Sequence, residues 1–344
     1  MRKNNWRNLF AVGLLATLPL TAAQAESNRI VLVVDGINQV RNLPALVADS
    51  QGYFKDEGLL VTMMELRDEA PADEMLADGR ADGSVAFYHH TFMTQVAGTP
   101  TESVITMGIS PALTLMVSER LRDRVHNVAD LKGMRIITGG LNSGKTTTAN
   151  WLIDHAGLKN TDYRALPLAP LDKMAAQLKS GDADAIVAHE PDATLYEQQH
   201  AAFRLAEVTS PEDTRRNLGN LFPTTSLYLR NDYVRANPET VQHLVNAFTK
   251  SLKFINSHSA DEIYAKLPPE ALKKAKEYRA VLGRDKPMFQ TDGRIDRADA
   301  AKLLEIMSEL QPKYKSVKLE ETSTNQFVEQ THAAVVQPGQ GTAR

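Results

Sequence analysis

Residues 134–150 read MRIITGGLNSGKTTTAN, and this stretch predicts a strand, a glycine-rich turn and a helix in immediate succession. Two isoleucines end the strand, Gly139 and Gly140 form the turn, and Ser143 is expected to cap a helix that stops at Gly157. The N–H groups at a helix start stabilise an anion by about 0.3–2 kcal/mol. The stretch therefore predicts an α/β unit that can receive a negatively charged group.

The same stretch also fits the phosphate-binding pattern G-x-x-x-x-G-K-[ST], which is typical of nucleotide hydrolases. In such enzymes a later strand ends in an aspartate that holds magnesium. Here the apolar strand at 185–188 ends in His189 and Glu190 instead. We therefore interpret Lys145 as a ligand-binding residue and not as a catalytic one.

The first 25 residues have the features of a cleaved signal peptide. A basic start with Arg2, Lys3 and Arg7 precedes an apolar run at 9–20 and an A-x-A site at 23–25. That run is too short to span a bilayer, and no later stretch of about 18 apolar residues follows. We therefore expect a soluble protein exported to the periplasm. ATP is not maintained there, which is a second argument against a nucleotide hydrolase.

The composition narrows the partners and the chemistry. The leader holds three basic residues and no acidic ones, so the mature chain has 36 Lys and Arg against 42 Asp and Glu. Nothing in this balance favours nucleic acid or an anionic membrane. The chain has no cysteine, so it has no disulfide, thiolate nucleophile or thiolate metal site. We expect a monomer with no metal and no cofactor.

Strand and helix signals alternate along the mature chain, which predicts an α/β protein with parallel sheets. A strand at 113–118 leads into a second α/β unit, a strand at 225–229 returns to the first, and the chain beyond is mainly helical. Crossovers near Ser110 and Thr224 then predict a hinge between two lobes, with two rigidly packed domains as the alternative. The expected division is a signal peptide over 1–25, one lobe over 26–110 and 225–320, the other over 111–224, and a disordered tail over 321–344.

Four segments resemble, in the same order, the nitrate, taurine, alkanesulfonate and thiamine-precursor branch of the periplasmic binding proteins. They are LPALVA at 43–48 with GYFKDEGL at 52–59, NVADLKG at 127–133, MAAQLKSGDADAIVAHEPDATL at 174–195, and NPE at 237–239. The resemblance implies the two-lobed type II fold, a small ligand held between the lobes, and an inner-membrane ABC permease as partner. His189 departs from the family, which often has an aromatic residue directly before its Glu-Pro pair.

Candidate ligand contacts are polar residues that directly follow strands, because ligands of open α/β sheets bind at the carboxyl ends of strands. They are Asn38, Tyr88, His89, His90, Ser110 and Thr225 in the first lobe and the crossovers, and Ser143, Gly144, Lys145, Thr146, His189 and Glu190 in the second lobe. Capping for Asn38 and Ser143, and a helix-start carboxylate for Glu190, are the structural alternatives. At most one of the two adjacent histidines is expected to reach the cleft.

Enzymes on this fold are weighed against simple binding proteins. The resemblance extends to a sulfinate desulfinase and a thiamine-pyrimidine synthase, whose families rely on cysteine or on a cysteine-rich motif, and this chain has none. No G-x-S-x-G elbow is present either. The sequence therefore predicts a non-enzymatic solute-binding component of an ABC importer, with a small anion such as a sulfonate or carboxylate as ligand. A thiamine-precursor pyrimidine is the alternative ligand, and an enzyme is the alternative class.

Overall fold

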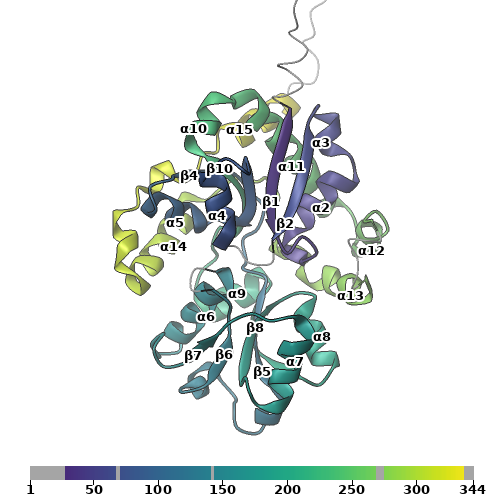
Figure 1. The fold of residues 1–344 in the computed structure, drawn as a ribbon. Helices are drawn as coiled ribbons and strands as arrows, with labels where there is room; N and C mark the ends of the chain where they lie inside the picture. Colours follow the sequence, from purple (N-terminus) through teal and green to yellow (C-terminus); the bar gives the residue numbers. More distant parts are fainter. Residues whose placement is uncertain (1–27, 67–69, 141–142, 269–274, 337–344) are drawn as a thin grey trace, which may run out of the picture.

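The computed structural model describes residues 28–66, 70–140, 143–268 and 275–336 (Figure 1). The expected signal peptide at 1–25 lies outside these residues. The chain forms two lobes, each built around a five-stranded sheet (Figure 1). Among the described residues, no helix is both long enough and apolar enough to cross a membrane.

The two sheets have the same arrangement of strands. The sheet of lobe 1 has the order β2-β1-β3-β10-β4, and that of lobe 2 has the order β7-β6-β8-β5-β9. The strands of lobe 1 are β1 (Arg29–Asp35), β2 (Leu60–Leu66), β3 (Gly83–Phe87), β4 (Thr101–Thr106) and β10 (Thr225–Arg230). Those of lobe 2 are β5 (Leu113–Ser118), β6 (Arg135–Ile137), β7 (Arg164–Leu166), β8 (Ala185–His189) and β9 (Ala202–Val208).

Both sheets are mixed, which corrects the expectation of parallel sheets. β10 runs antiparallel to β3 and β4, and β5 runs antiparallel to β8 and β9. These two strands are the ones by which the chain enters lobe 2 and returns to lobe 1. Each inserts next to the parallel βαβ strands from the opposite direction, and the alternating sequence pattern does not carry that information.

Helices cover the faces of both sheets (Figure 1). Lobe 2 carries α6 (Gly144–His155), α7 (Leu171–Ser180), α8 (Asp192–Gln198) and α9 (Pro211–Leu218), with η2 (Glu119–Leu121) and η3 (Val128–Leu131). Lobe 1 carries η1 (Val40–Asn42), α2 (Leu43–Ser50), α3 (Tyr53–Asp56), α4 (Ala70–Ala77), α5 (His90–Val96), α10 (Asn231–Ala236), α11 (Pro238–Ser257), α12 (Ala260–Tyr264), α13 (Ala275–Asp285), η5 (Lys286–Met288), α14 (Arg297–Leu310), η6 (Pro312–Ser316), η7 (Leu319–Glu321) and α15 (Gln326–Val336).

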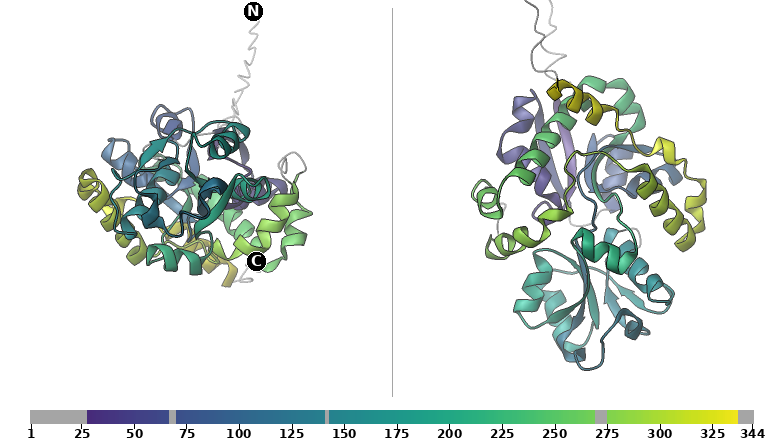
Figure 2. Two further views of the ribbon diagram at one scale, coloured as in Figure 1. Left: turned by 90° about the horizontal axis from the view of Figure 1, so that it is seen from below. Right: turned by 180° about the vertical axis from the view of Figure 1, so that it is seen from behind.

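The C-terminal part differs from the expected disordered tail. α15 packs beside α11 at the end of lobe 1 farthest from lobe 2 (Figures 1 and 2). Phe327 and Val328 are buried there in the core of lobe 1. In the sequence this apolar pair has polar neighbours on both sides, so it is too short to predict a buried helix. Lobe 1 therefore continues through residue 336.

The two crossover segments lie side by side between the lobes, which are seen from behind in Figure 2. Met107 N–H donates to the Thr225 carbonyl over 2.7 Å, and Thr224 N–H donates to the Gly108 carbonyl over 2.9 Å. The Thr224 hydroxyl donates to the Ser110 carbonyl over 2.9 Å. The lobes are thus joined by a narrow, hydrogen-bonded pair of strands.

Aromatic stacking ties helix α6 to the return crossover. The ring of Trp151 stacks on Phe222 with centroids 4.4 Å apart, and both rings are buried.

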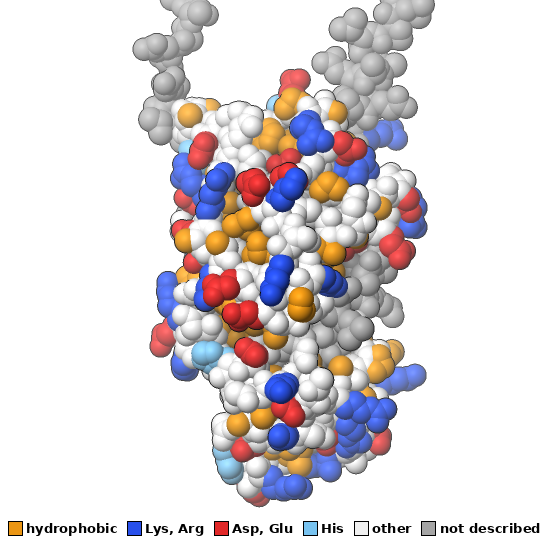
Figure 3. Space-filling view, turned by 90° about the vertical axis from the view of Figure 1, so that its left-hand side faces the viewer, with side chains coloured by type: hydrophobic (Ala, Val, Ile, Leu, Met, Phe, Trp, Pro, Cys, Tyr) orange, Lys and Arg blue, Asp and Glu red, His pale blue; other side chains and the backbone are white. Residues whose placement is uncertain are grey.

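The outer surface of the molecule carries many charged side chains. On the face drawn in Figure 3, acidic and basic side chains are interspersed over both lobes.

Candidate functional site

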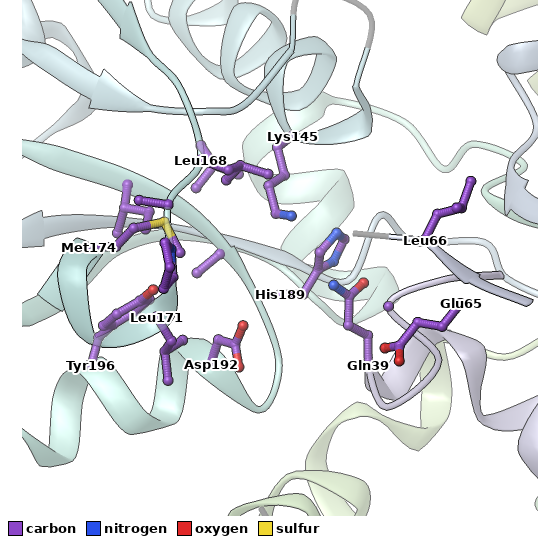
Figure 4. A pocket seen from close by; sticks show the side chains of 16 residues that line it. Gln39, Glu65, Leu66, Lys145, Leu168, Leu171, Met174, His189, Asp192 and Tyr196 are labelled. Atoms are coloured by element: carbon purple, nitrogen blue, oxygen red, sulfur yellow. The ribbon is translucent and has the colours of Figure 1, made fainter. Parts of the chain in front are cut away.

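A cavity of about 620 Å³ lies between the two lobes (Figure 4). Lobe 1 contributes Gln39 and Glu65, together with Gly36 and Leu66. Lobe 2 contributes an apolar wall from α7, β8 and the chain before α7, and three polar side chains: Lys145, His189 and Asp192. Small-molecule sites have volumes of about 300–1,000 Å³, so the cavity is large enough for a metabolite.

Lys145 lies in the first turn of α6, and its ammonium points into the cavity (Figure 4). Within the described part of the chain, no carboxylate lies close enough to this ammonium for an ion pair. Two carboxylates also line the cavity: that of Glu65, at the end of β2 in lobe 1, and that of Asp192, at the start of α8 in lobe 2. The cavity thus combines one ammonium group with two carboxylates.

His189 is the other predicted site residue that lines the cavity. It ends β8, and its Nδ1 lies 3.3 Å from the carbonyl of Ala112 in the first crossover. Its ring faces Phe87 of lobe 1 at a centroid distance of 6.1 Å. The imidazole is therefore held where both lobes and the crossover meet.

The start of α6 is capped from within, as the structural alternative for Ser143 anticipated. The Ser143 hydroxyl accepts from the Thr146 N–H over 3.2 Å and donates to the Thr138 carbonyl over 3.2 Å. The Thr146 hydroxyl donates to the Gly140 carbonyl over 2.7 Å. These two hydroxyls form hydrogen bonds with backbone groups of the turn. Both residues are buried, and neither lines the cavity.

Phe87 of lobe 1 covers the start of α6, which the sequence did not reveal. Its ring packs on Gly144 so closely that a Cβ atom at residue 144 would overlap it. The Arg41 guanidinium lies 4.8 Å from the ring centroid on Phe87 and pairs with Asp35 over 2.6 Å. In this conformation an aromatic ring lies where the sequence predicted an anion. Of the described residues at the helix start, Lys145 alone lines the cavity.

The Tyr-His-His run after β3 lies inside lobe 1, which corrects its expected place in the cleft. The Tyr88 hydroxyl is 2.6 Å from that of Thr322, and burial raises the pKa of Tyr88. The rings of His89 and His90 are 4.9 Å apart, and His90 stacks on Tyr228. Both histidines are buried, and neither lines the cavity. β3 ends at Phe87, one residue before the expected end of the strand, and α5 begins at His90.

Three other predicted residues do not line the cavity, and each has a buried side-chain oxygen with no hydrogen-bond partner among the described residues. Ser110 and Thr225 are buried in the paired crossovers. Asn38 lies in the turn between β1 and η1, and it is also absent from the cavity wall. Whether any of these residues binds a ligand stays a prediction.

Glu190 pairs with two arginines and not with Lys145, and it also accepts from the start of α8, as the structural alternative anticipated. Its Oε1 accepts from Arg204 and from Arg284, each over 2.6 Å. Its Oε2 accepts from the N–H and the hydroxyl of Thr194. Burial raises the pKa of Glu190, but the two guanidinium groups outweigh burial and hold the pKa below its usual value.

The Glu190 cluster joins the lobes, because Arg284 belongs to α13 of lobe 1 and Glu190 to lobe 2. Arg284 also pairs with the buried Asp285 over 2.6 Å. Burial raises the pKa of Asp285 to about 6, against the opposing effect of Arg284. A backbone bond from the Val40 N–H to the Glu190 carbonyl, 3.1 Å long, crosses the same boundary.

Across the described ranges, no three His, Cys, Asp or Glu side chains converge in a way that could hold a metal ion.

The sequence signals for the missed residues differ in strength. Glu65 and Asp192 each lie near the end of a predicted strand, so the rule used for the other candidates would have included them. Arg284 has no local signal, because its partner lies 94 residues away in the sequence.

The two lobes, the paired crossovers and the cavity between them define the periplasmic-binding-protein fold. A protein from Bordetella bronchiseptica RB50 has this fold with a TM-score of 0.82 and 26% identity, over 90% of this chain and 98% of that one. The alkanesulfonate-binding protein SsuA from Xanthomonas axonopodis pv. citri, bound to MOPS, gives a TM-score of 0.65 and 17% identity, over 85% of this chain and 95% of that one.

The chain belongs to the NMT1/THI5-like family, whose model matches residues 39–261. A relative from Saccharomyces cerevisiae is the 4-amino-5-hydroxymethyl-2-methylpyrimidine phosphate synthase THI13. It is 24% identical over 219 residues, which are 62% of this chain and 63% of the relative. The match thus spans less than two thirds of the length of that relative.

These relatives correct one prediction. Proteins from Saccharomyces cerevisiae, Aspergillus parasiticus and Candida albicans that match this chain are named as synthases. The prediction of a non-enzymatic protein is therefore wrong. Its basis was the lack of cysteine, which excludes thiolate chemistry but not chemistry by the histidine, lysine or carboxylate side chains that the chain does have.

Proposed function

We propose that the protein is the periplasmic solute-binding component of an ABC-type importer, and that it captures a small molecule with a negatively charged group between its lobes. The observation that carries this proposal is the ammonium of Lys145, which points into a cavity lined by both lobes. An inner-membrane permease is the expected partner. The narrow pair of crossovers supports the proposal, because such a connection lets two lobes close on a ligand.

The energy required is compatible with this cavity. Micromolar binding corresponds to about −8 kcal/mol. A charge-assisted hydrogen bond from Lys145 contributes about 1.5–3 kcal/mol. The apolar side chains of Leu168, Leu171 and Met174 supply buried surface at about 25 cal/mol per Å² for much of the remainder.

The first test identifies the small molecule that copurifies with the protein by mass spectrometry and measures its affinity for the wild type and for Lys145→Met. We expect the variant to bind about tenfold more weakly or worse. Lys159→Met is the matched control, because Lys159 is an exposed lysine that follows the same helix and does not line the cavity. Equal affinity of the wild type and Lys145→Met would contradict the proposed role of this lysine.

A second candidate function follows from the names of the relatives. In this alternative the cavity binds a thiamine-precursor pyrimidine, either for transport or as part of a synthase reaction. Calorimetry with unphosphorylated 4-amino-5-hydroxymethyl-2-methylpyrimidine, which has no negatively charged group, separates the candidates. Tight binding of this compound, or formation of its phosphate by the purified protein, would favour the second candidate over an anion importer.

A further inference from the structure

The charges of the cavity have both signs, which is unusual for a site that would take a simple anion. Lys145 contributes the positive charge, and Glu65 and Asp192 contribute carboxylates from the two lobes. Figure 4 shows the Lys145 ammonium and the Asp192 carboxylate directed toward the same open space from opposite sides, with Gln39 and Glu65 along the lobe 1 side.

An anion would be attracted near Lys145 and disfavoured near Glu65 and Asp192. Glu65 is exposed and the other two residues are half-buried, so water screens both effects in part. A ligand with charges or donors of both kinds avoids the conflict, since its anionic end lies near Lys145 and its donor end near the carboxylates. Such matching of charge is the ordinary source of specificity in polar sites.

The rest of the wall indicates what joins the two ends of the ligand. The side chains of Leu168, Leu171 and Met174 form the lobe 2 wall of the cavity, to one side of Lys145 and Asp192 (Figure 4). An apolar or aromatic body packs well on such a surface, and the thioether of Met174 adapts to its shape.

We infer that the cavity selects a dipolar ligand. Its anionic group pairs with Lys145, a cationic amine or another strong hydrogen-bond donor pairs with Glu65 and Asp192, and a compact apolar body separates the two. This inference rests on the proposed function and names the ligand class of the same site. Asp192 and Glu65 are then specificity-determining residues for the donor end of the ligand.

Two compounds of nearly equal shape test the inference: 4-(aminomethyl)benzoate, which is dipolar, and 4-ethylbenzoate, which is only anionic. Calorimetry on the full protein should show the dipolar compound binding about tenfold more tightly. Glu65→Gln and Asp192→Asn should each reduce this preference at least about threefold, because an amide lacks the charge that attracts the ammonium group. Lys145→Met should weaken the binding of both compounds.

Glu74→Gln is the matched control, because Glu74 is an exposed carboxylate of lobe 1 outside the cavity. It should leave the preference unchanged. Equal or tighter binding of 4-ethylbenzoate, an unchanged preference in both carboxylate variants, or no binding of either compound would overturn the dipolar ligand. The proposed function fails in a different way, namely if binding does not respond to Lys145→Met.

Discussion

Two of the contacts between the lobes have opposite character. In one, the ring of Phe87 from lobe 1 packs on Gly144 at the start of α6 in lobe 2. In the other, Arg284 from lobe 1 reaches the buried carboxylate of Glu190 in lobe 2. The first contact requires the absence of a side chain, and the second requires two charged side chains at once.

The difference shows how the two lobes can pack closely at their boundary and still separate. The apolar contact gains from burial, but it has little room for change because a Cβ atom already overlaps the ring. In the charged contact, Arg284 remains partly exposed, so water can solvate it when the lobes part. We expect the apolar contact to set how closely the lobes approach and the charged contact to set how easily they separate.

The largest effect is expected at Arg41, whose guanidinium packs on the Phe87 ring of the apolar contact. Arg41→Met should lower the free energy of unfolding by about 3–5 kcal/mol, because Asp35 then stays buried without the guanidinium that it pairs with. Denaturant unfolding followed by circular dichroism measures this. Arg80→Met, which removes an exposed pair with Asp78, should cost less than about 1 kcal/mol. Similar costs for the two variants would contradict the supporting role of Arg41.

The next effect is a pH dependence in the charged contact. The pKa of Asp285 is raised from 3.8 to about 6 in the folded protein, so this group contributes stability below about pH 4 that is lost as the pH rises through 6. Asparagine does not titrate. Between pH 4 and 6.5, Asp285→Asn should therefore gain about 2 kcal/mol relative to the wild type.

Urea unfolding at a series of pH values measures this change. The exposed Asp182→Asn serves as the control and should show no such trend. A stability difference between Asp285→Asn and the wild type that stays constant with pH, or changes in the opposite direction, would contradict the raised pKa.

A smaller loss is expected at the centre of the charged contact. Glu190→Gln keeps the shape of the side chain but removes the charge shared by Arg204 and Arg284, at a cost of about 2 kcal/mol. Glu119→Gln is the exposed comparison, because its pair with Arg122 lies on the surface. Small-angle scattering should also show a more open shape for Glu190→Gln, and an unchanged shape would argue against a role in holding the lobes together.

The smallest effect is expected at Gly144. Gly144→Ala should cost about 1–2 kcal/mol, because its methyl group forces the Phe87 ring or the lobes to move. Gly283→Ala, in helix α13 with open space around it, should be neutral or stabilising by up to about 1 kcal/mol. If the overlap is the cause, Phe87→Ala should reduce the cost of the alanine at residue 144 in a double-mutant cycle.

Much of the fold could be predicted because its signals are local. The buried strands β1 and β8 are short apolar runs, and the start of α6 has a serine cap and a glycine-rich turn directly before it. The two-lobed fold was confirmed by the solved structures that share it. The strands β5 and β10 were predicted, but their antiparallel direction and the helix α15 were not, because these depend on pairing with distant parts of the chain.

The candidate site was less predictable for the same reason. Lys145 and His189 line the cavity because each directly follows a local signal, a helix start or a strand end. The two arginine partners of Glu190 lie 14 and 94 residues away, and no pattern near Glu190 points to either. Phe87 reads as an ordinary end of a buried strand, and only the three-dimensional structure places it against Gly144.

Trp151, which stacks on Phe222, can serve as an intrinsic fluorescence probe of this protein. The sequence has two tryptophans, and the other, Trp6, belongs to the segment expected to be removed on export. Trp151 lies on α6, the helix that carries Lys145, and its ring rests on the return crossover. The emission of a single indole should therefore follow the relative motion of the lobes in the unlabelled mature protein.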